Sequence, residues 1–149
     1  MSSESRSWRL RPARPDDYDA IVTVWTRSGL PTSPRGRDRR EAFLVQLAHF
    51  PTSYVVATVK EQIVGVVLGT HDARKGWINR LAVLPEYQRR GVAADLIRAA
   101  EAALRDEGID IVAALVEPDN LPSAELFRRM GYLTDVEVLY FRKRAHPDV

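Results

Sequence analysis

The stretch between residues 77 and 116 restricts the fold of this chain more than any other. Residues 77–84 predict a strand, residues 93–104 repeat apolar side chains at helical spacing, and residues 109–116 are almost wholly apolar. An apolar run of this kind is typical of a strand buried on both faces. Strand, helix and strand in this order form a βαβ unit, so we expect the two strands to be parallel.

A short basic turn joins the first of these strands to the helix, with the sequence Gln88-Arg89-Arg90-Gly91-Val92-Ala93. The first N–H groups of a helix have no partner within it, and the helix dipole adds partial positive charge there. Gly91 lets the backbone approach a ligand closely, and the two arginines can hydrogen-bond phosphate. The turn therefore predicts an anion site. It is not a P-loop, which needs Gly-Lys-Ser/Thr, and it lacks two glycines of the dinucleotide-binding fingerprint.

The remaining patterns place further strands and helices around this unit. Together the strands predict an antiparallel meander joined to one βαβ unit, which gives a mixed sheet with helices on both faces. We expect one α/β (α+β) domain over residues 1–149, because a chain of this length forms one core. The predicted strands are 8–13, 53–60, 63–70 and a closing strand at 136–140, and the predicted helices are 15–28, 37–49 and 121–130.

Composition excludes several classes of protein. The chain has no cysteine, which excludes disulfides, thiolate metal sites and a cysteine nucleophile, and no His/Asp/Glu spacing indicates a metal site. The N-terminus lacks the apolar segment of a signal peptide, and no apolar run approaches the roughly 20 residues of a membrane span, so we expect a cytoplasmic protein. The basic run at residues 35–40 is better explained as an exposed helix start than as a nucleic-acid site.

A second motif follows the buried strand and consists of Asn120, Ser123, Phe127 and Gly131-Tyr132. Strand, Q-x-x-G-x-A, helix, strand, N-x-x-S, short helix and G-Y resembles the GNAT superfamily of acetyl-CoA-dependent N-acetyltransferases. Small bacterial members similar to the ribosomal-protein alanine acetyltransferases are the nearest in pattern. The resemblance covers nearly the whole chain. It implies a central sheet of about six to seven strands with a V-shaped splay between the two central parallel strands.

The resemblance also implies acetyl-CoA as cofactor and assigns residues to it. The turn amides would hold the pyrophosphate, the edge of the preceding strand would pair with the pantetheine arm, and Asn120 would contact the pantetheine. Asn120 is equally suited to capping the helix that it precedes, and one residue can fill both roles. The residues expected to bind the cofactor are Leu81, Ala82, Val83, Gln88, Arg89, Arg90, Gly91, Val92, Ala93, Asn120, Ser123 and Phe127.

The implied reaction is direct transfer of acetyl to a primary amine of a small molecule or a peptide N-terminus. The amine must be neutral to attack, so a base or desolvation is required. Three positions depart from the family pattern: Phe127 replaces a tyrosine that protonates the leaving thiolate in relatives, and Leu115 and Trp77 stand where relatives carry a base. Loss of a positioned acid or base typically slows a reaction about 10²–10⁴-fold.

Strand alternation identifies two replacement candidates. Glu117 shares a face with Leu115 beside the expected splay, although a solvated carboxylate at a strand end is the simpler interpretation. Asn79 shares a face with Trp77 and Leu81 and can order a water molecule. We expect substrate contacts from Leu30, His71, Trp77 and Arg80.

The sequence leaves one alternative function and the oligomeric state open. The missing acid and base positions also fit a non-catalytic module that binds acyl-CoA. The sequence leaves both a monomer and a homodimer open, because an exposed final strand offers an edge for pairing.

Overall fold

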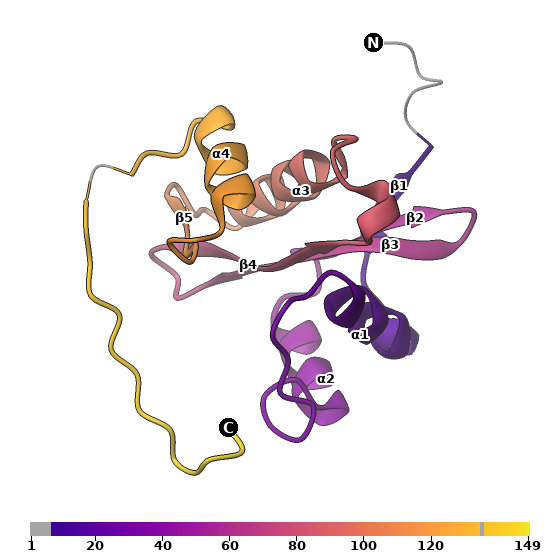
Figure 1. Cartoon of the computed structure of the whole chain (residues 1–149), viewed down its shortest axis with the longest axis horizontal. Coiled ribbons are helices and arrows are strands. Elements are labelled where there is room, and N and C mark those ends of the chain that lie inside the picture. The colour runs from indigo at the N-terminus through magenta and orange to yellow at the C-terminus, as the bar shows by residue number, and fades with distance from the viewer. Residues whose placement is uncertain (1–6, 135) are drawn as a thin grey trace.

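A five-stranded mixed sheet forms the centre of the computed structural model, which describes residues 7–134 and 136–149 (Figure 1). The strands lie in sequence order across the sheet, the first four antiparallel and the last pair parallel. The predicted meander and the predicted parallel pair are therefore confirmed. The strands are β1 (Arg9–Pro12), β2 (Tyr54–Val59), β3 (Gln62–His71), β4 (Gly76–Val83) and β5 (Val112–Ala114).

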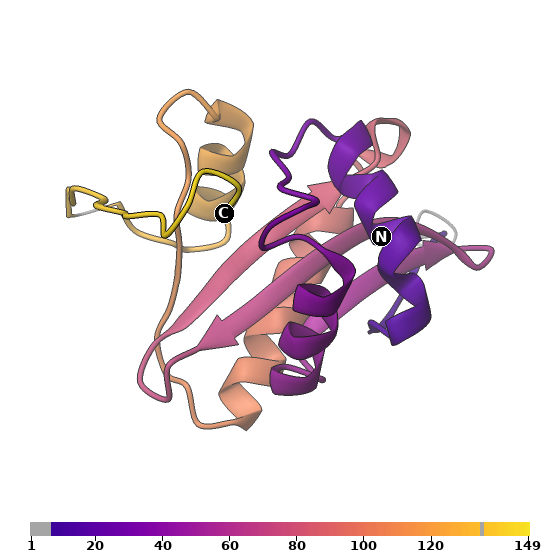
Figure 2. The ribbon, with the colours of Figure 1, turned by 90° about the horizontal axis from the view of Figure 1, so that it is seen from below.

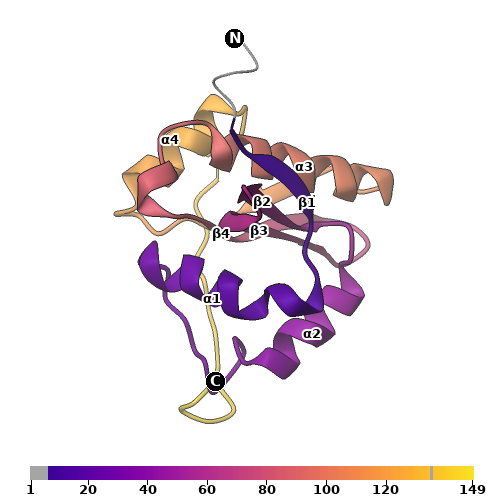
Figure 3. The same ribbon diagram turned by 90° about the vertical axis from the view of Figure 1, so that its right-hand side faces the viewer.

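Helices cover both faces of the sheet, as predicted (Figure 3). On one face lie α1 (Tyr18–Arg27) and α2 (Arg40–His49), and on the other lie α3 (Val92–Asp106) and α4 (Leu121–Arg129). Two short 3-10 helices, η2 (Pro15–Asp17) and η3 (Pro85–Tyr87), precede α1 and follow β4. Figure 2, seen from below, shows how α1, α2 and their connection lie against the sheet.

The helix α3 packs closely on β3 because β3 carries glycine where the two meet. A Cβ atom on Gly65 would stand 3.0 Å from Leu96, and one on Gly69 would stand 3.3 Å from Leu104. Leu96 and Leu104 are fully buried, and each contributes about 1.5–3 kcal/mol of hydrophobic free energy to folding. This packing fixes the start of α3, and thus the basic turn, against the sheet.

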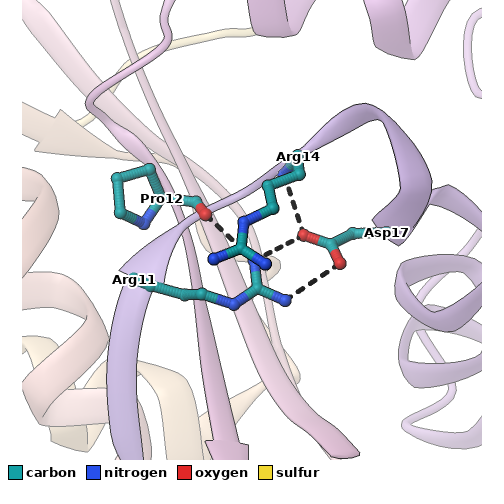
Figure 4. A network of polar contacts seen from close by, with 4 residues as sticks. All are labelled: Arg11, Pro12, Arg14 and Asp17. Carbon is teal, nitrogen blue, oxygen red and sulfur yellow. Dashed lines mark hydrogen bonds and ion pairs between the residues drawn. The ribbon is translucent and has the colours of Figure 1, made fainter. Parts of the chain in front are cut away.

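A partly buried ion pair joins β1 to η2 (Figure 4). The Arg11 guanidinium donates to both carboxylate oxygens of Asp17, at 2.7 and 3.0 Å, and the Arg14 backbone N–H donates to the same carboxylate at 2.8 Å. Burial alone would raise the pKa of Asp17. The hydrogen bonds from Arg11 and Arg14 outweigh burial and hold this pKa below its usual value of 3.8.

The predicted closing strand at residues 136–140 is not formed, so the sheet has five strands rather than six to seven. Residues 136–141 run without regular structure outside the layers of the fold, and their side chains are exposed (Figure 1). The physical reason lies in β5, which is only three residues long and offers a short ladder at the edge of the sheet.

In the part of the chain that the structure describes, no helix has the length and apolar character needed to cross a membrane.

Candidate functional site

The two parallel strands at the centre of the site pair over three residues and then separate. Gly76, Trp77 and Ile78 of β4 pair with Val112, Ala113 and Ala114 of β5, and the register ends there. From residue 79 to Val83, β4 continues without a β5 partner. Parallel strands run in the same direction, so this opening faces the end of β4 at which the basic turn begins. The predicted V-shaped splay is present.

The basic turn leaves the first N–H groups of α3 without a side-chain cap. Gly91, which has no side chain to cap the helix, occupies the N-cap position in the left-handed region, with φ of 102°. Arg89 is also left-handed, with φ of 63°. Gln88 donates from Nε2 to the carbonyl of Val83 at 2.9 Å, which ties the turn back to β4. Gln88, Arg89, Arg90 and Gly91 are all exposed. An exposed, uncapped helix start is suited to an anion.

Trp8 and Asp95 support this helix start from behind. The indole Nε1 of Trp8 donates to Asp95 Oδ2 at 2.9 Å, and the Trp8 ring lies 3.8 Å from the position of a Cβ on Gly91. Arg98 pairs with the other oxygen of Asp95 at 3.2 Å. Asp95, in the first turn of α3, is thus engaged by Trp8 and Arg98. Trp8 made no part of the predicted site, because its long-range partner cannot be read from local spacing.

A β-bulge in β4 lies directly after the paired segment. Val66 pairs with Ala82 and Leu68 pairs with Asn79, so two residues of β4 stand opposite the single residue between these partners on β3. One of the two is Arg80, whose φ of 53° is unusual for a residue with a side chain. A bulge interrupts the strict alternation of a strand. The prediction that Asn79 and Leu81 share a face therefore fails, because it assumed a regular strand.

The bulge directs Arg80 under the connection between α1 and α2. Its Nη1 donates to the carbonyl of Pro31 at 2.9 Å, its Nη2 lies 3.3 Å from Asp38 Oδ1, and its guanidinium stacks 4.3 Å from the centre of the Trp25 ring. Asp38 in turn accepts from the backbone N–H of Ser33 at 2.7 Å. Burial lowers the pKa of Arg80, and Asp38 opposes that shift. Arg80 thus anchors the loop that leads from α1 to α2.

Several polar atoms around Arg80 are buried without a hydrogen-bond partner among the described residues. They are the Nε and Nη2 atoms of Arg80, the hydroxyl of Tyr54 and the indole N–H of Trp25. Tyr54 is fully buried, and its burial raises the pKa of its hydroxyl. Tyr54 and Trp25 made no part of the predicted site, whereas Arg80 was predicted to contact the substrate. The position of Arg80 depends on the bulge, which nothing in the local sequence indicates.

Asn120 caps α4, as one of its two predicted roles required. Its side-chain oxygen accepts from the backbone N–H of Ser123 at 3.3 Å, and both residues stand at the start of the helix that follows the splay. Phe127, by contrast, is only 7% exposed and packs edge-on against Tyr132, with ring centres 4.9 Å apart. The structure therefore places Phe127 in the core rather than along an open groove.

The side chain of Asn79 is held within the sheet at the first position of β4 that has no partner on β5. Its amide donates to Thr70 Oγ1 at 2.8 Å. Trp77, two residues earlier, is still in the paired ladder and lies under the ammonium of Lys75, 5.2 Å from the ring centre. Of the remaining predicted substrate residues, Leu30 belongs to the anchored loop and its N–H donates to the Trp25 carbonyl at 3.0 Å.

His71 and Glu117 have different surroundings. Nδ1 of His71 accepts from the backbone N–H of Ala73 at 3.0 Å, its Nε2 lies 3.6 Å from Glu107, and its ring packs on Phe50. His71 pairs with the first residue of β4, so it lies beside the closed end of the splay and is engaged there. Glu117 is exposed on the turn after β5, where its carbonyl accepts from the Asn120 N–H at 2.9 Å.

The fold and the splayed parallel pair define the class of protein, and comparison with known proteins gives the family. Residues 18–132 match the model of the acetyltransferase (GNAT) family. The chain is 31% identical to an acetyltransferase of Pectobacterium atrosepticum and 30% identical to one of Sodalis glossinidius. Both alignments span 141 residues, 93% of this chain and 96% of the relative. The chain therefore belongs to the GNAT acetyltransferase family, whose members use acetyl-CoA.

Solved structures share the fold at lower identity. The PaiA N-acetyltransferase of Thermoplasma acidophilum, in complex with coenzyme A, matches with a TM-score of 0.77 at 18% identity, over 89% of this chain and 94% of that one. The ribosomal-protein-S18-alanine N-acetyltransferase of Escherichia coli matches with a TM-score of 0.68 at 16% identity, over 83% and 76%. The resemblance stated from the sequence is confirmed at the level of family and fold.

Proposed function

We propose that this protein is an N-acetyltransferase that moves acetyl from acetyl-CoA to a primary amine by direct transfer within a ternary complex. The observation that carries the proposal is the β4–β5 pair, which separates after three residues and opens toward the uncapped start of α3. An extended ligand can lie along the freed edge of β4 while its phosphates meet the helix N-terminus.

The cofactor residues follow from this arrangement. We assign the pyrophosphate to the backbone N–H groups from Arg90 to Ala93, with the exposed side chains of Arg89 and Arg90 adding charge. The pantetheine arm is assigned to the backbone of Leu81 to Val83. We assign Asn120 and Ser123, at the start of α4, to the opposite side of the splay. Gln88 shapes the turn, since its side chain is engaged by Val83. Phe127 is withdrawn from the direct contacts because it is buried.

Bound acetyl-CoA supplies an activated thioester, and the protein must present a neutral amine to it. A lysine-like amine has a pKa of about 10.4 and an α-amine one of about 7.7–8.0, so both need deprotonation or desolvation at neutral pH. Glu117 is the candidate that removes this proton, directly or through one water molecule. Asn79 is the first residue of β4 without a partner on β5, and Thr70 orients its amide. We assign it the role of positioning a water molecule.

The acceptor is assigned to the face of the sheet covered by the α1–α2 connection. Leu30 and Trp77 are its proposed contacts, and Arg80 contributes by anchoring the loop onto β4. His71 is no longer supported as a contact, because Glu107, Phe50 and Ala73 engage it at the closed end of the splay. The Escherichia coli enzyme named above acts, by its name, on an alanine of ribosomal protein S18, so a peptide α-amine is one of the acceptors that we propose to test.

The test is release of free thiol from acetyl-CoA across a panel of amines, polyamines, amino acids and peptide N-termini. We expect thiol release that depends on the acceptor. Mass spectrometry should detect the acceptor with the added mass of an acetyl group. Tight acetyl-CoA binding without release on any acceptor would instead support the non-catalytic acyl-CoA-binding module. This second function is supported by the positions at which relatives carry a base or an acid. In this chain they hold side chains that do not ionise, namely Leu115, Trp77 and Phe127.

We also expect a cytoplasmic location. The proposal is compatible with both a monomer and a homodimer.

A further inference from the structure

The Arg80 cluster, formed by Arg80, Tyr54 and Trp25, lies under the α1–α2 connection and contains buried polar atoms without partners. Tyr54 is 0% exposed and Trp25 is 2% exposed. Among the described residues, neither the Tyr54 hydroxyl nor the Trp25 indole N–H has a hydrogen-bond partner, and the same holds for Nε and Nη2 of Arg80. Leaving a buried polar group unpaired is costly, so such groups usually bind water or a ligand.

The unpaired atoms of the Arg80 cluster need acceptors rather than donors. The indole and guanidinium N–H groups can only donate, and the tyrosine hydroxyl can donate as well. The carboxylate of Asp38 lies 3.3 Å from Nη2 of Arg80, but it also accepts from the backbone N–H of Ser33. A ligand that satisfies the cluster must therefore bring oxygen atoms that accept hydrogen bonds.

The positive charge of Arg80 is also incompletely balanced. Burial lowers the pKa of Arg80, Asp38 opposes that shift, and the positive charge of Arg37 adds to it, so the pKa stays below its usual value. By contrast, the pKa of Arg11 is raised, because its hydrogen bond to Asp17 outweighs burial. A negatively charged ligand beside Arg80 would supply the charge that Asp38 alone does not.

The backbone of β4 is distorted where it carries Arg80. The φ of 53° at this residue is unfavourable for a residue with a side chain, and the residue belongs to the bulge opposite β3. Bulges often redirect a side chain next to an active site, and strained backbone is concentrated at sites that bind ligands. The side chain of Arg80 remains 23% exposed, so a ligand can reach it from solvent.

Arg80 also lies where the acyl end of the cofactor is expected. Asn79 and Arg80 are the first two residues of β4 without a partner on β5. With the pyrophosphate at the start of α3 and the pantetheine arm on residues 81–83, an extended cofactor that continues in the same direction brings its thioester to residues 79 and 80. An acceptor held by Arg80 therefore has its amine close to the acetyl group.

We propose that the acceptor is an amine that also carries a carboxylate, and that this carboxylate binds to Arg80, Tyr54 and Trp25. Its two oxygens offer about four acceptor positions, enough for the unpaired donors of the Arg80 cluster. Arg37, which is exposed, adds a second positive charge near the cluster. Amino acids and peptides that begin with an acidic residue belong to this class, whereas alkylamines and polyamines do not. The inference names the substrate class of the proposed acetyl transfer and rests on that function.

The first experiment compares acceptors that differ in the carboxylate alone. The pairs are glycine with glycinamide, β-alanine with β-alaninamide, and a tripeptide that begins with aspartate with one that begins with asparagine. In at least one pair the carboxylate should bind about tenfold more tightly or better, by calorimetric titration in the presence of coenzyme A, because a hydrogen bond to a charged group typically contributes that factor. Its kcat/KM for acetylation should exceed that of its partner to the same extent. Equal constants, or no binding, in every pair would overturn the proposal.

The second experiment tests whether the Arg80 cluster is the binding site. Tyr54→Phe removes a hydroxyl that has no partner among the described residues, so it should not lower the unfolding temperature. It should lower the preference for the carboxylate over the carboxamide by about threefold or more. Tyr54 is better suited than Arg80, whose replacement would also release the α1–α2 connection.

The matched control is Tyr132→Phe. The hydroxyl of Tyr132 donates to Glu101 of α3, so this variant should lose stability and keep the full preference for the carboxylate. A Tyr54→Phe protein that also keeps the full preference would show that water alone occupies the Arg80 cluster, and the proposal would be wrong.

The two readouts separate this inference from the proposed function. If no acceptor is acetylated, the proposed function fails, while the binding comparison in the presence of coenzyme A still decides whether the carboxylate site exists. If amines are acetylated equally well with and without a carboxylate, the proposed function stands and the carboxylate site is wrong.

Discussion

Single residues around the splay combine structural and proposed chemical roles. Asn120 caps α4 through the Ser123 N–H, and Gln88 ties the basic turn to Val83. Both belong to the motif that indicated the family, so part of that motif serves the backbone itself. Variants that keep one role and remove the other can separate the two.

Glu117 tests the proposed base. Glu117→Gln should lower the acetyl-transfer rate at neutral pH by about 10²-fold or more, because a positioned base typically contributes 10²–10⁴-fold. Affinity for acetyl-CoA should not change. Glu125→Gln, an exposed glutamate on α4, is the matched control and should keep the full rate. An unchanged pH–rate profile for Glu117→Gln would remove this residue as the base.

Asn120 tests whether the capping residue also contacts the cofactor. Asn120→Ala should lower the free energy of unfolding by about 1 kcal/mol through loss of the cap. Asn120→Ser should restore most of that stability, since serine is also a good cap, but should still bind acetyl-CoA more weakly than the unmodified protein. Calorimetric titration beside thermal unfolding separates the effects. Full recovery of affinity in the serine variant would leave Asn120 with the capping role alone.

The residue scale is also where prediction from sequence reached its limit. Gly91 adopts the left-handed backbone that glycine favours, while its contact with the cofactor stays a prediction. Arg80 was assigned to the substrate by type, but its left-handed backbone and its place under the α1–α2 connection depend on a bulge. Arginine does not favour that conformation, so only tertiary contacts determine it.

At the scale of elements, one contact between neighbouring elements and one between segments far apart in sequence hold the framework of the site. Arg11 of β1 pairs with Asp17 of η2, and Arg80 of β4 anchors the connection from α1 to α2. The sequence predicted the elements themselves well, since the helical and strand periodicities in residues 77–116 are strong. The closing strand failed because its alternation specifies a strand but not a partner.

Asp17 makes stability depend on pH. Because its pKa is lowered in the folded state, its contribution is present above the pKa of an unfolded aspartate and is lost as the pH falls through the folded value. Asp17→Asn should therefore lower the free energy of unfolding at pH 7 by about 1–3 kcal/mol. The difference from the unmodified protein should shrink as the pH falls below about 4.

The control for this prediction is Asp16→Asn, at the exposed neighbouring position. It should change stability little at any pH. Thermal unfolding between pH 3 and pH 7 gives the comparison. A penalty for Asp17→Asn that is the same at every pH would contradict the ionic account of this contact.

Arg80 tests the anchoring of the α1–α2 connection. Arg80→Leu removes the bonds to Pro31 and Asp38, so hydrogen exchange at the Gly36 and Asp38 amides, which both donate to Ser33, should accelerate at least tenfold. Arg74→Leu, an exposed arginine in the β3–β4 hairpin, should leave that exchange unchanged. Equal exchange in both variants would show that the loop is held by other contacts.

For the molecule as a whole, one sheet brings a basic turn, a split parallel pair and an anchored loop to one region. The βαβ unit places the turn and the splay at the same end of β4, which is why an anion site at the turn could be predicted from sequence order, whereas the cofactor was implied by the resemblance to the family. The acceptor surface could not be predicted in this way, since it depends on what lies under a loop. Net charge of +2 gives no long-range preference for an acidic or a basic partner.

The most direct measurement compares acetyl-CoA affinity in two glycine variants at the two ends of α3. Gly91 and Gly108 are both left-handed, with φ of 102° and 84°, and both have space for a methyl group. Gly91→Ala and Gly108→Ala should therefore lose similar stability, roughly 1 kcal/mol. The account predicts at least tenfold weaker binding of acetyl-CoA by calorimetric titration for Gly91→Ala alone. Equal affinity in the two variants would contradict the assignment of the cofactor to the turn at the start of α3.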